Sequence, residues 1–253
     1  MTKSVVIAGM GEVGAVIAAG ARANGWDVRE VRQGQSLTDA AAKSDGPIVL
    51  AMREDDFEAP FREANARRPG AVILVQNGFI DEVIAGVEHT RCVLWLTKKG
   101  DFVCNARETL SSGPWAEELS RWLSTKGVPA RVESEGRVRR EGLEKAAWSC
   151  LVGNGTFAYG RAFAELVRDD QDTARAIVNE ACDVASRVLE TEVTRAGAWA
   201  MVEQTREALG WMKGSAKGLA WRSGKVVKWA EESLGDGMAA VANGEVVRRV
   251  LAK

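Results

Sequence analysis

The sequence predicts an α/β protein in which an N-terminal parallel β-sheet is followed by a second, all-helical domain. Short apolar, β-branched runs alternate with helix-compatible segments in the first half of the chain. Long amphipathic helical patterns replace them after residue 141, and no further strand pattern follows. The 253 residues suffice for two unequal domains. We expect these domains to span residues 1–132 and 133–253.

The chain opens with a βαβ-sized unit. Residues 4–8 form a buried-strand pattern that ends at a glycine-rich turn, and an alanine-rich helical stretch covers residues 15–23. Asn24 and Gly25 supply a helix stop, after which residues 26–32 read as a second strand.

The alternation then continues. Buried-strand patterns cover residues 48–52, 71–75 and 93–96, with a charged helical segment at 55–67. Residues 102–132 hold further strand signals and a helix candidate at 115–124, and the clearest helix of the second half spans 174–189.

Composition excludes several classes of protein. The 34 Lys and Arg residues against 35 Asp and Glu give a net charge of −1, which argues against a nucleic-acid partner. No apolar run approaches the roughly 18 residues of a membrane span, and no signal-peptide pattern precedes the first strand, so we expect a cytoplasmic protein without membrane association. Four scattered cysteines and the single His89 predict neither a metal site nor a Ser-His-Asp triad.

The glycine-rich turn has the spacing of a dinucleotide-binding motif in a Rossmann-type domain. Its first glycine permits the tight turn, its second lets a pyrophosphate approach the backbone, and its third lets helix and strand pack closely. The helix N-terminus then offers free N–H groups and a partial positive charge to phosphate. The alternative is a tight turn without a ligand. The expected cofactor-binding residues of this turn are Gly9, Met10, Gly11, Glu12, Val13 and Gly14.

The end of the second strand bears on the choice between NAD and NADP. An acid there binds the ribose 2′-hydroxyl, whereas an arginine meets the 2′-phosphate. The chain offers both Glu30 and Arg32, with Arg29 nearby. We favour NADP, because Arg32 lies at the strand's carboxyl edge before a turn; an ordinary solvated strand edge is the alternative.

Two further residues are candidates for chemistry. Asn77 follows a buried strand in the sequence Val75-Gln76-Asn77-Gly78-Phe79, at the sheet edge where ligands bind in open parallel sheets. Lys145 shares a helical face with Ser149 and either Val152 or Gly153. A desolvated lysine beside a cofactor can donate a proton near neutral pH. A lysine that extends its ammonium to solvent explains the spacing equally well.

The motifs GMGEVG at Gly9, a basic residue at Arg32, ILVQNGF around Asn77 and EKAAWSCLVGN around Lys145 occur in this order. The chain thereby resembles the ketopantoate reductases, within the wider 6-phosphogluconate-dehydrogenase-like group. The resemblance implies a Rossmann domain and a helical domain that bind NADPH and a 2-oxo acid in the cleft between them. It also implies that Lys145 protonates the ketone oxygen as hydride reaches the carbon, and that Asn77 lines the nicotinamide side.

The chain departs from the family pattern around the lysine. Asparagines are expected four and eight residues after it, where this chain has Ser149 and Gly153, with Asn154 one place later. We carry Ser149 and Asn154 as catalytic candidates beside Lys145, and Asn154 also as a substrate hydrogen-bonding residue.

Later positions depart as well. Arg53 replaces the lysine that the family has after the third strand. Of the late serine and glutamate, Ser215 is present as a substrate-binding candidate, but Val227 and Lys228 stand near the acid's place. Removal of an acid alters the electrostatics of a neighbouring lysine, so the substrate or the catalytic arrangement is expected to differ.

The last quarter of the chain is rich in tryptophan and in basic residues. The tryptophans fit core packing, a substrate pocket or a subunit interface, and are compatible with a homodimer. The basic run faces either solvent or an anionic ligand. These residues are Trp199, Trp211, Trp221 and Trp229, and Lys213, Lys217, Arg222, Lys225 and Lys228.

The expected activity is therefore NADPH-dependent reduction of a small 2-oxo acid to the 2-hydroxy acid, or the reverse oxidation. A reductase of another carbonyl or imine and a non-catalytic nucleotide-binding relative remain alternatives.

Overall fold

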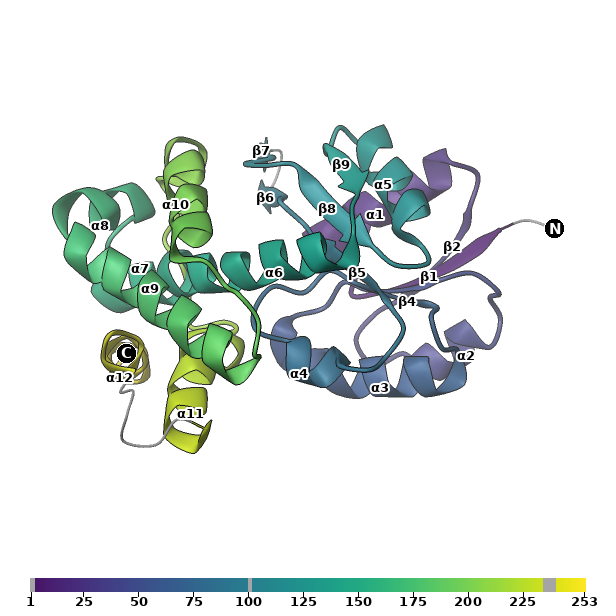
Figure 1. Ribbon diagram of the computed structural model, residues 1–253. Helices are drawn as coiled ribbons and strands as arrows, with labels where there is room; N and C mark the ends of the chain where they lie inside the picture. Colours follow the sequence, from purple (N-terminus) through teal and green to yellow (C-terminus); the bar gives the residue numbers. More distant parts are fainter. Residues whose placement is uncertain (1–2, 100–101, 234–239) are drawn as a thin grey trace. The chain divides into compact units, whose positions relative to one another are not determined.

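The computed structural model describes residues 3–99, 102–233 and 240–253. The chain divides into two compact units. The sheet unit combines Met1–Gln76 with Glu82–Arg139, and the helical unit combines Asn77–Asp81 with Arg140–Lys253. Figure 1 draws the sheet unit mainly in purple to teal and the helical unit mainly in green to yellow. The sequence places a domain boundary at residue 132, and this boundary stays a prediction.

The main sheet of the sheet unit has the strand order β2-β1-β3-β4-β5-β8-β9. Neighbours pair in parallel except β5 and β8, which are antiparallel. Val6 of β1 lies between Arg29 of β2 and Ile48 of β3, so the strand order reverses direction between β1 and β3. The strands are β1 (Ser4–Ala8), β2 (Asp27–Val31), β3 (Ile48–Leu50), β4 (Val72–Leu74), β5 (Thr90–Val93), β8 (Thr109–Ser112) and β9 (Ala130–Val132).

Helices cover both faces of this sheet, with α1 and α5 on one side and α2 and α3 on the other (Figure 1). Side chains alternate along β1, and Val5 and Ile7 join a core with Ile17 of α1 and Leu119 of α5. The remaining elements of this part of the chain are α1 (Glu12–Ala23), α2 (Leu37–Ala41), the short helix η1 (Glu54–Asp56), α3 (Glu58–Arg67), α4 (Asp81–Ile84), the hairpin β6 (Thr97–Lys99) and β7 (Phe102–Cys104), and α5 (Ala116–Thr125).

Helices α1 and α5 approach each other closely at a glycine. A Cβ atom added at Gly20 would lie 2.2 Å from the carbonyl oxygen of Trp122. The fully buried Trp122 in turn packs edge-on against Trp26, with 5.0 Å between the ring centroids. Gly20 therefore sets how near α5 can lie to α1.

The strand expected at residues 93–96 lies at Thr90–Val93 instead. Its register is set by antiparallel pairing with β8, in which Arg91 faces Ser112 and Val93 faces Leu110. Thr90 is fully buried, and its hydroxyl accepts a hydrogen bond from the N–H of Trp115 at 2.8 Å. Because Thr90 is polar, it interrupts the apolar pattern by which the sequence marks a buried strand. The predicted start of this strand at residue 93 was therefore wrong.

The helical unit is built around α9 (Gln171–Val188), which packs against several neighbouring helices. Its buried face is rich in small residues, including Ala174, Ala181 and Ala185, which permit close helix packing. The Asp170 side chain caps this helix by accepting from the N–H of Thr173 at 3.3 Å, so α9 begins earlier than the expected residue 174. The other helices are α6 (Glu135–Ser149), the π-helical segment η2 (Cys150–Gly155), α7 (Thr156–Tyr159), α8 (Phe163–Asp169), α10 (Arg195–Leu209), η3 (Leu219–Trp221), α11 (Ser223–Ser233) and α12 (Val241–Leu251).

The expected α/β fold with a helical second part is confirmed, and no strand occurs among the described residues after 132. None of the helices in the described ranges is both long and apolar enough to cross a membrane.

We expect Gly20→Ala to destabilise the protein by about 2 kcal/mol, because the added Cβ forces α1 and α5 apart. Thermal unfolding should show this as a lower Tm. Gly136→Ala in α6 is the matched control, since nothing lies within 4 Å of its added Cβ, and alanine is the better helix former. Equal Tm values for the two variants would contradict the close approach.

Candidate functional site

The glycine-rich turn between β1 and α1 has the geometry that its spacing predicts. Gly9 has a φ of +94°, and a Cβ atom there would lie 2.6 Å from the backbone of Ala51. A Cβ at Gly14 would lie 2.0 Å from the carbonyl oxygen of Gly9, whereas a Cβ at Gly11 would meet nothing within 4 Å. Gly9 and Gly14 are therefore required by the fold, and Gly11 leaves open space above the backbone.

The N-terminus of α1 is available to a ligand. Gly11 is its N-cap residue and provides no side-chain hydrogen bond. The first backbone N–H groups of a helix have no intrahelical partner and carry a partial positive charge. Gly11 and Glu12 are exposed, and Met10 and Val13 are half-buried. The turn thus presents backbone donors to solvent, as a phosphate site requires.

The location of this turn in the sheet also suits a ligand. The turn follows β1, and Ala51, which it contacts, follows β3. The strand order of the sheet reverses between β1 and β3. Ligands of open α/β sheets bind at the carboxyl ends of the strands at such a reversal.

An arginine pair surrounds Glu30 at the end of β2. Its carboxylate accepts from Arg22 at 2.7 Å and from Arg32 at 3.0 Å. The bond from Arg22, followed by that from Arg32, holds the pKa of the Glu30 carboxyl below its ordinary value. Arg32 has 68% of its side chain exposed. The acid and the arginine that the sequence offered as alternatives are therefore bonded to each other.

Lys145 and Asn77 meet within the helical unit. The Lys145 ammonium donates to Oδ1 of Asn77 at 2.5 Å. Lys145 is 5% exposed, and Asn77 is half-buried. A lysine that extends along the surface would keep its ammonium in water, which differs from what is observed here. The catalytic role of Lys145 stays a prediction.

The segment that carries Asn77 is anchored to the start of α11. Phe79 donates its backbone N–H to the carbonyl oxygen of Trp221 at 2.9 Å. Its buried ring packs 5.2 Å from the ring of Trp229. Gly78 has a φ of +106°, and a Cβ there would lie 2.7 Å from the Trp221 oxygen. Gly78 is thus required for this contact.

The two polar candidates that follow Lys145 have structural partners. Ser149 is buried, and its hydroxyl donates to the carbonyl oxygen of Ala146 at 2.7 Å. Asn154 is fully buried, and its amide donates to the backbone oxygen of Ser215 at 3.1 Å. Asn154 therefore holds the loop that bears Ser215. Whether Ser149 or Asn154 contacts a substrate stays a prediction.

Ser215 lies in a loop that packs directly on the π-helical segment. Its backbone N–H donates to the carbonyl oxygen of Gly153 at 3.1 Å. The N–H of Gly214 donates to the Thr156 hydroxyl at 2.7 Å. The Ser215 hydroxyl accepts from the N–H of Lys217 at 3.3 Å, and the residue is half-buried. The structure thus brings Ser215 and Asn154 together around η2.

Glu144 is a buried acid that the sequence analysis did not single out. It is 5% exposed and accepts from the Thr194 hydroxyl at 2.5 Å, at the N-terminus of α10. A Cβ at Gly197 would lie 2.2 Å from the Glu144 carboxylate. The position of Glu144 directly before Lys145 was the only sequence signal that could have drawn attention to it. The structure shows that its carboxylate is bonded by Thr194, before α10.

The basic run of the last quarter does not form one solvated face. Lys213, Lys217 and Lys228 are exposed, whereas Arg222 and Lys225 are half-buried. The Lys225 ammonium lies over the ring of Trp229, 5.1 Å from its centroid. The four tryptophans also differ, since Trp229 is 2% exposed and Trp211 is 48% exposed. Core packing therefore explains only some of them.

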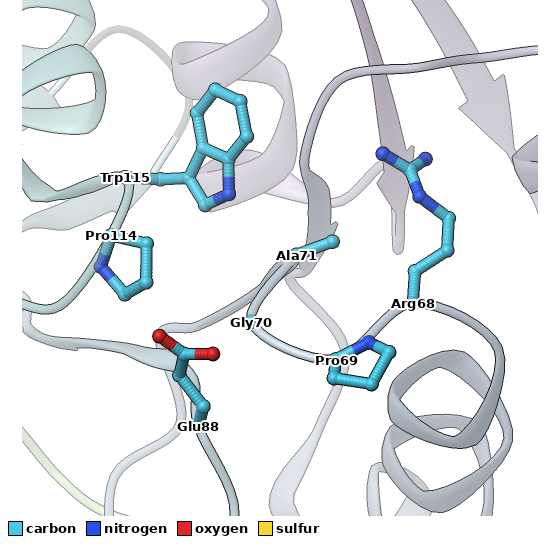
Figure 2. A pocket seen from close by; sticks show the side chains of 7 residues that line it. All are labelled: Arg68, Pro69, Gly70, Ala71, Glu88, Pro114 and Trp115. Carbon is cyan, nitrogen blue, oxygen red and sulfur yellow. The ribbon is translucent and has the colours of Figure 1, made fainter.

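A cavity of about 450 Å³ opens at a different edge of the sheet unit. It adjoins the amino ends of β4 and β5, away from the glycine-rich turn at the carboxyl end of β1. Figure 2 shows the Glu88 carboxylate and the Trp115 indole beside it, with Arg68 extending away. No residue expected in the active site lines it. The lining residues are Arg68, Pro69, Gly70, Ala71, Glu88, Pro114 and Trp115.

Potential metal ligands are dispersed in the part of the chain that the structure describes. No group of three or more His, Cys, Asp or Glu residues gathers there in a way that could hold a metal ion. None of the four cysteines forms a disulfide bond, and burial raises the pKa of the Cys150 thiol to about 12.

The sequence matches no protein-family model and no curated protein. Solved structures are similar over nearly the whole chain. A ketopantoate reductase from Ralstonia eutropha superimposes with a TM-score of 0.76 and 15% identity, over 98% of this chain and 97% of that chain. A D-mandelate dehydrogenase, in a ternary structure with NADH and anilino(oxo)acetate, gives 0.74 and 15% over the same shares. A dimeric ketopantoate reductase from Staphylococcus aureus gives 0.67 and 14%, over 99% and 100%.

These similarities define the class of fold. The chain has the two-domain fold of the ketopantoate reductases, and the resemblance inferred from its ordered motifs is confirmed at the level of the fold.

We expect Asn154→Ala to lower the free energy of unfolding by about 1–3 kcal/mol, because it removes a buried donor that holds the Ser215 loop. Ser149→Ala should lower it by less than about 1 kcal/mol, since the Ser149 hydroxyl donates only to a carbonyl oxygen of its own helix. Denaturant unfolding of both variants measures the difference. Wild-type stability of Asn154→Ala would show that its amide does not hold the loop.

Proposed function

We propose that this protein is an NADPH-dependent reductase that converts a small 2-oxo acid to the 2-hydroxy acid. The observation that carries the proposal is the hydrogen bond from the ammonium of the buried Lys145 to Asn77. Few structural needs explain a lysine in this environment, because burying an ammonium is costly. A proton donor for a carbonyl oxygen explains it.

The residues present fit a dinucleotide. The open space above Gly11 and the uncapped N-terminus of α1 suit a pyrophosphate, held by backbone groups of the turn from Gly9 to Gly14. Arg32 is the residue we assign to the 2′-phosphate. Because Arg22 and Arg32 offset the charge of the Glu30 carboxylate, this acid repels a nearby 2′-phosphate less, which favours NADPH over NADH.

The nicotinamide, when bound, supplies a hydride to the carbonyl carbon. Lys145 donates a proton from Nζ to the carbonyl oxygen, so the ketone takes up one hydride and one proton and becomes an alcohol. Asn77 accepts one of the three ammonium hydrogens and thereby fixes the direction of the others. Ser149, Asn154 and Ser215 are the residues we assign to positioning the substrate, Asn154 through the loop that it holds.

Two other functions stay open. The absence of asparagine at Ser149 and Gly153 and of an acid at Lys228 suits a different carbonyl or imine substrate. A nucleotide-binding protein without catalysis would retain the turn but would not need the Lys145 to Asn77 bond. A homodimer is the assembly we propose, because the similar Staphylococcus aureus reductase is dimeric and the exposed Trp211 is of a residue type enriched at interfaces.

Lys145→Ala should lower kcat for 2-oxo acid reduction by about a hundredfold to ten-thousandfold, because general acid catalysis is lost. NADPH affinity should not change. Lys213→Ala is the control, since that lysine is exposed in the loop after α10. Steady-state kinetics measures kcat, and a binding titration measures NADPH affinity. Turnover by Lys145→Ala at the wild-type rate would contradict the assigned role.

Arg32→Ala should weaken NADPH binding about tenfold, through loss of a charge-assisted contact to the 2′-phosphate. NADH lacks this phosphate and provides the internal control, so its affinity should stay within about twofold. Fluorescence titration with both nucleotides measures the ratio. An equal loss for both nucleotides would place Arg32 outside the phosphate site.

A further inference from the structure

Arg222 occupies a site made by glycines. Its guanidinium nitrogen Nη1 lies 2.3 Å from where a Cβ on Gly153 would be, so the guanidinium packs on bare backbone. A Cβ on Gly218 would lie 3.2 Å from the same guanidinium group. Any larger residue at position 153 would displace the guanidinium. The fold thus accommodates a charged group against the helix that carries Lys145.

The position of Arg222 ties it to the Asn77 segment. The preceding residue, Trp221, accepts the N–H of Phe79 through its carbonyl oxygen. Asn77, two residues before Phe79, accepts from Lys145. The same short segment therefore connects the start of α11 to the lysine, and both cations belong to the helical unit.

The sequence on either side of Arg222 carries only positive charge. From Ala208 to Ala230 the sequence contains five Lys and Arg residues and no Asp or Glu. Helix α11 begins at Ser223, directly after Arg222, so the positive end of its dipole adds to the guanidinium charge. The acid nearest Lys145 in sequence, Glu144, is engaged by Thr194 at the start of α10.

From these observations we propose that Arg222 binds the carboxylate of the substrate and determines specificity for acids over uncharged ketones. This inference rests on the proposed function and names the residue that recognises the acid. A guanidinium presents paired N–H donors that match the two oxygens of a carboxylate. Gly153 contributes by leaving the space in which the guanidinium lies.

The test is equilibrium binding, which needs no turnover. Oxamate, an inert 2-oxo acid analogue, and oxamide, its uncharged counterpart, are titrated into the protein with and without NADPH. Tryptophan fluorescence reports binding, because Trp221 adjoins Arg222. Wild type should bind oxamate more tightly than oxamide. Arg222→Gln should lose about tenfold to a hundredfold in oxamate affinity and none in oxamide affinity.

Gly153→Ala provides a second, independent variant. Its Cβ meets only the flexible end of Arg222, so Tm should stay at the wild-type value while oxamate affinity falls as in Arg222→Gln. Lys213→Ala, which removes an exposed cation of the same basic run, should bind as wild type does.

The outcomes separate the two proposals. Oxamate binding that depends on Arg222, without turnover of any 2-oxo acid, supports the carboxylate site and refutes the reductase. Reduction of 2-oxo acids with unchanged KM in Arg222→Gln supports the reductase and overturns the site. Failure of the wild type to prefer oxamate over oxamide also overturns the site.

Discussion

The arrangement of the helical unit depends on one short segment that leaves the sheet after β4. Asn77, Gly78 and Phe79 pack against Trp221 and Trp229, and this packing delivers the Asn77 carboxamide to the Lys145 ammonium. A buried ammonium is tolerated only with a hydrogen-bond partner. The segment therefore satisfies a lysine that would otherwise be costly, and it fixes the start of α11, where Arg222 lies. The proposed proton donor and the proposed carboxylate site share this anchor.

Glycine supplies the second constraint. Gly9 and Gly14 let β1, α1 and the end of β3 come together, and Gly20 does the same for α1 and α5. Gly153 lets the Arg222 guanidinium lie on the helix backbone. In each case a side chain would meet an atom within 2.6 Å. Gly11 differs, because its Cβ would meet nothing; its lack of a side chain matters to a ligand rather than to the fold.

The sequence predicted the parallel strands well because strands buried on both faces are continuous β-branched runs. It misplaced β5, where Thr90 interrupts the apolar pattern. The helix of Lys145 was found from its spacing, but regular spacing rules assume an α-helix and could not reveal the π-helical turn at Cys150–Gly155. Contacts distant in sequence, such as Lys145 with Asn77 and Gly153 with Arg222, were beyond local patterns. The family resemblance assigned Lys145 and Asn77 to one site without predicting their hydrogen bond, and the packing of Gly153 and Arg222 came from the structure alone.

The central claim is that this chain couples a nicotinamide nucleotide to a 2-oxo acid. Its most direct test follows the absorbance of NADPH, and of NADH in parallel, during incubation of the wild type with ketopantoate and a panel of other 2-oxo acids. The account predicts oxidation of NADPH with formation of one 2-hydroxy acid per nucleotide consumed. The account would be contradicted if neither NADPH nor NADH bound tightly and neither nucleotide were oxidised in the presence of any 2-oxo acid.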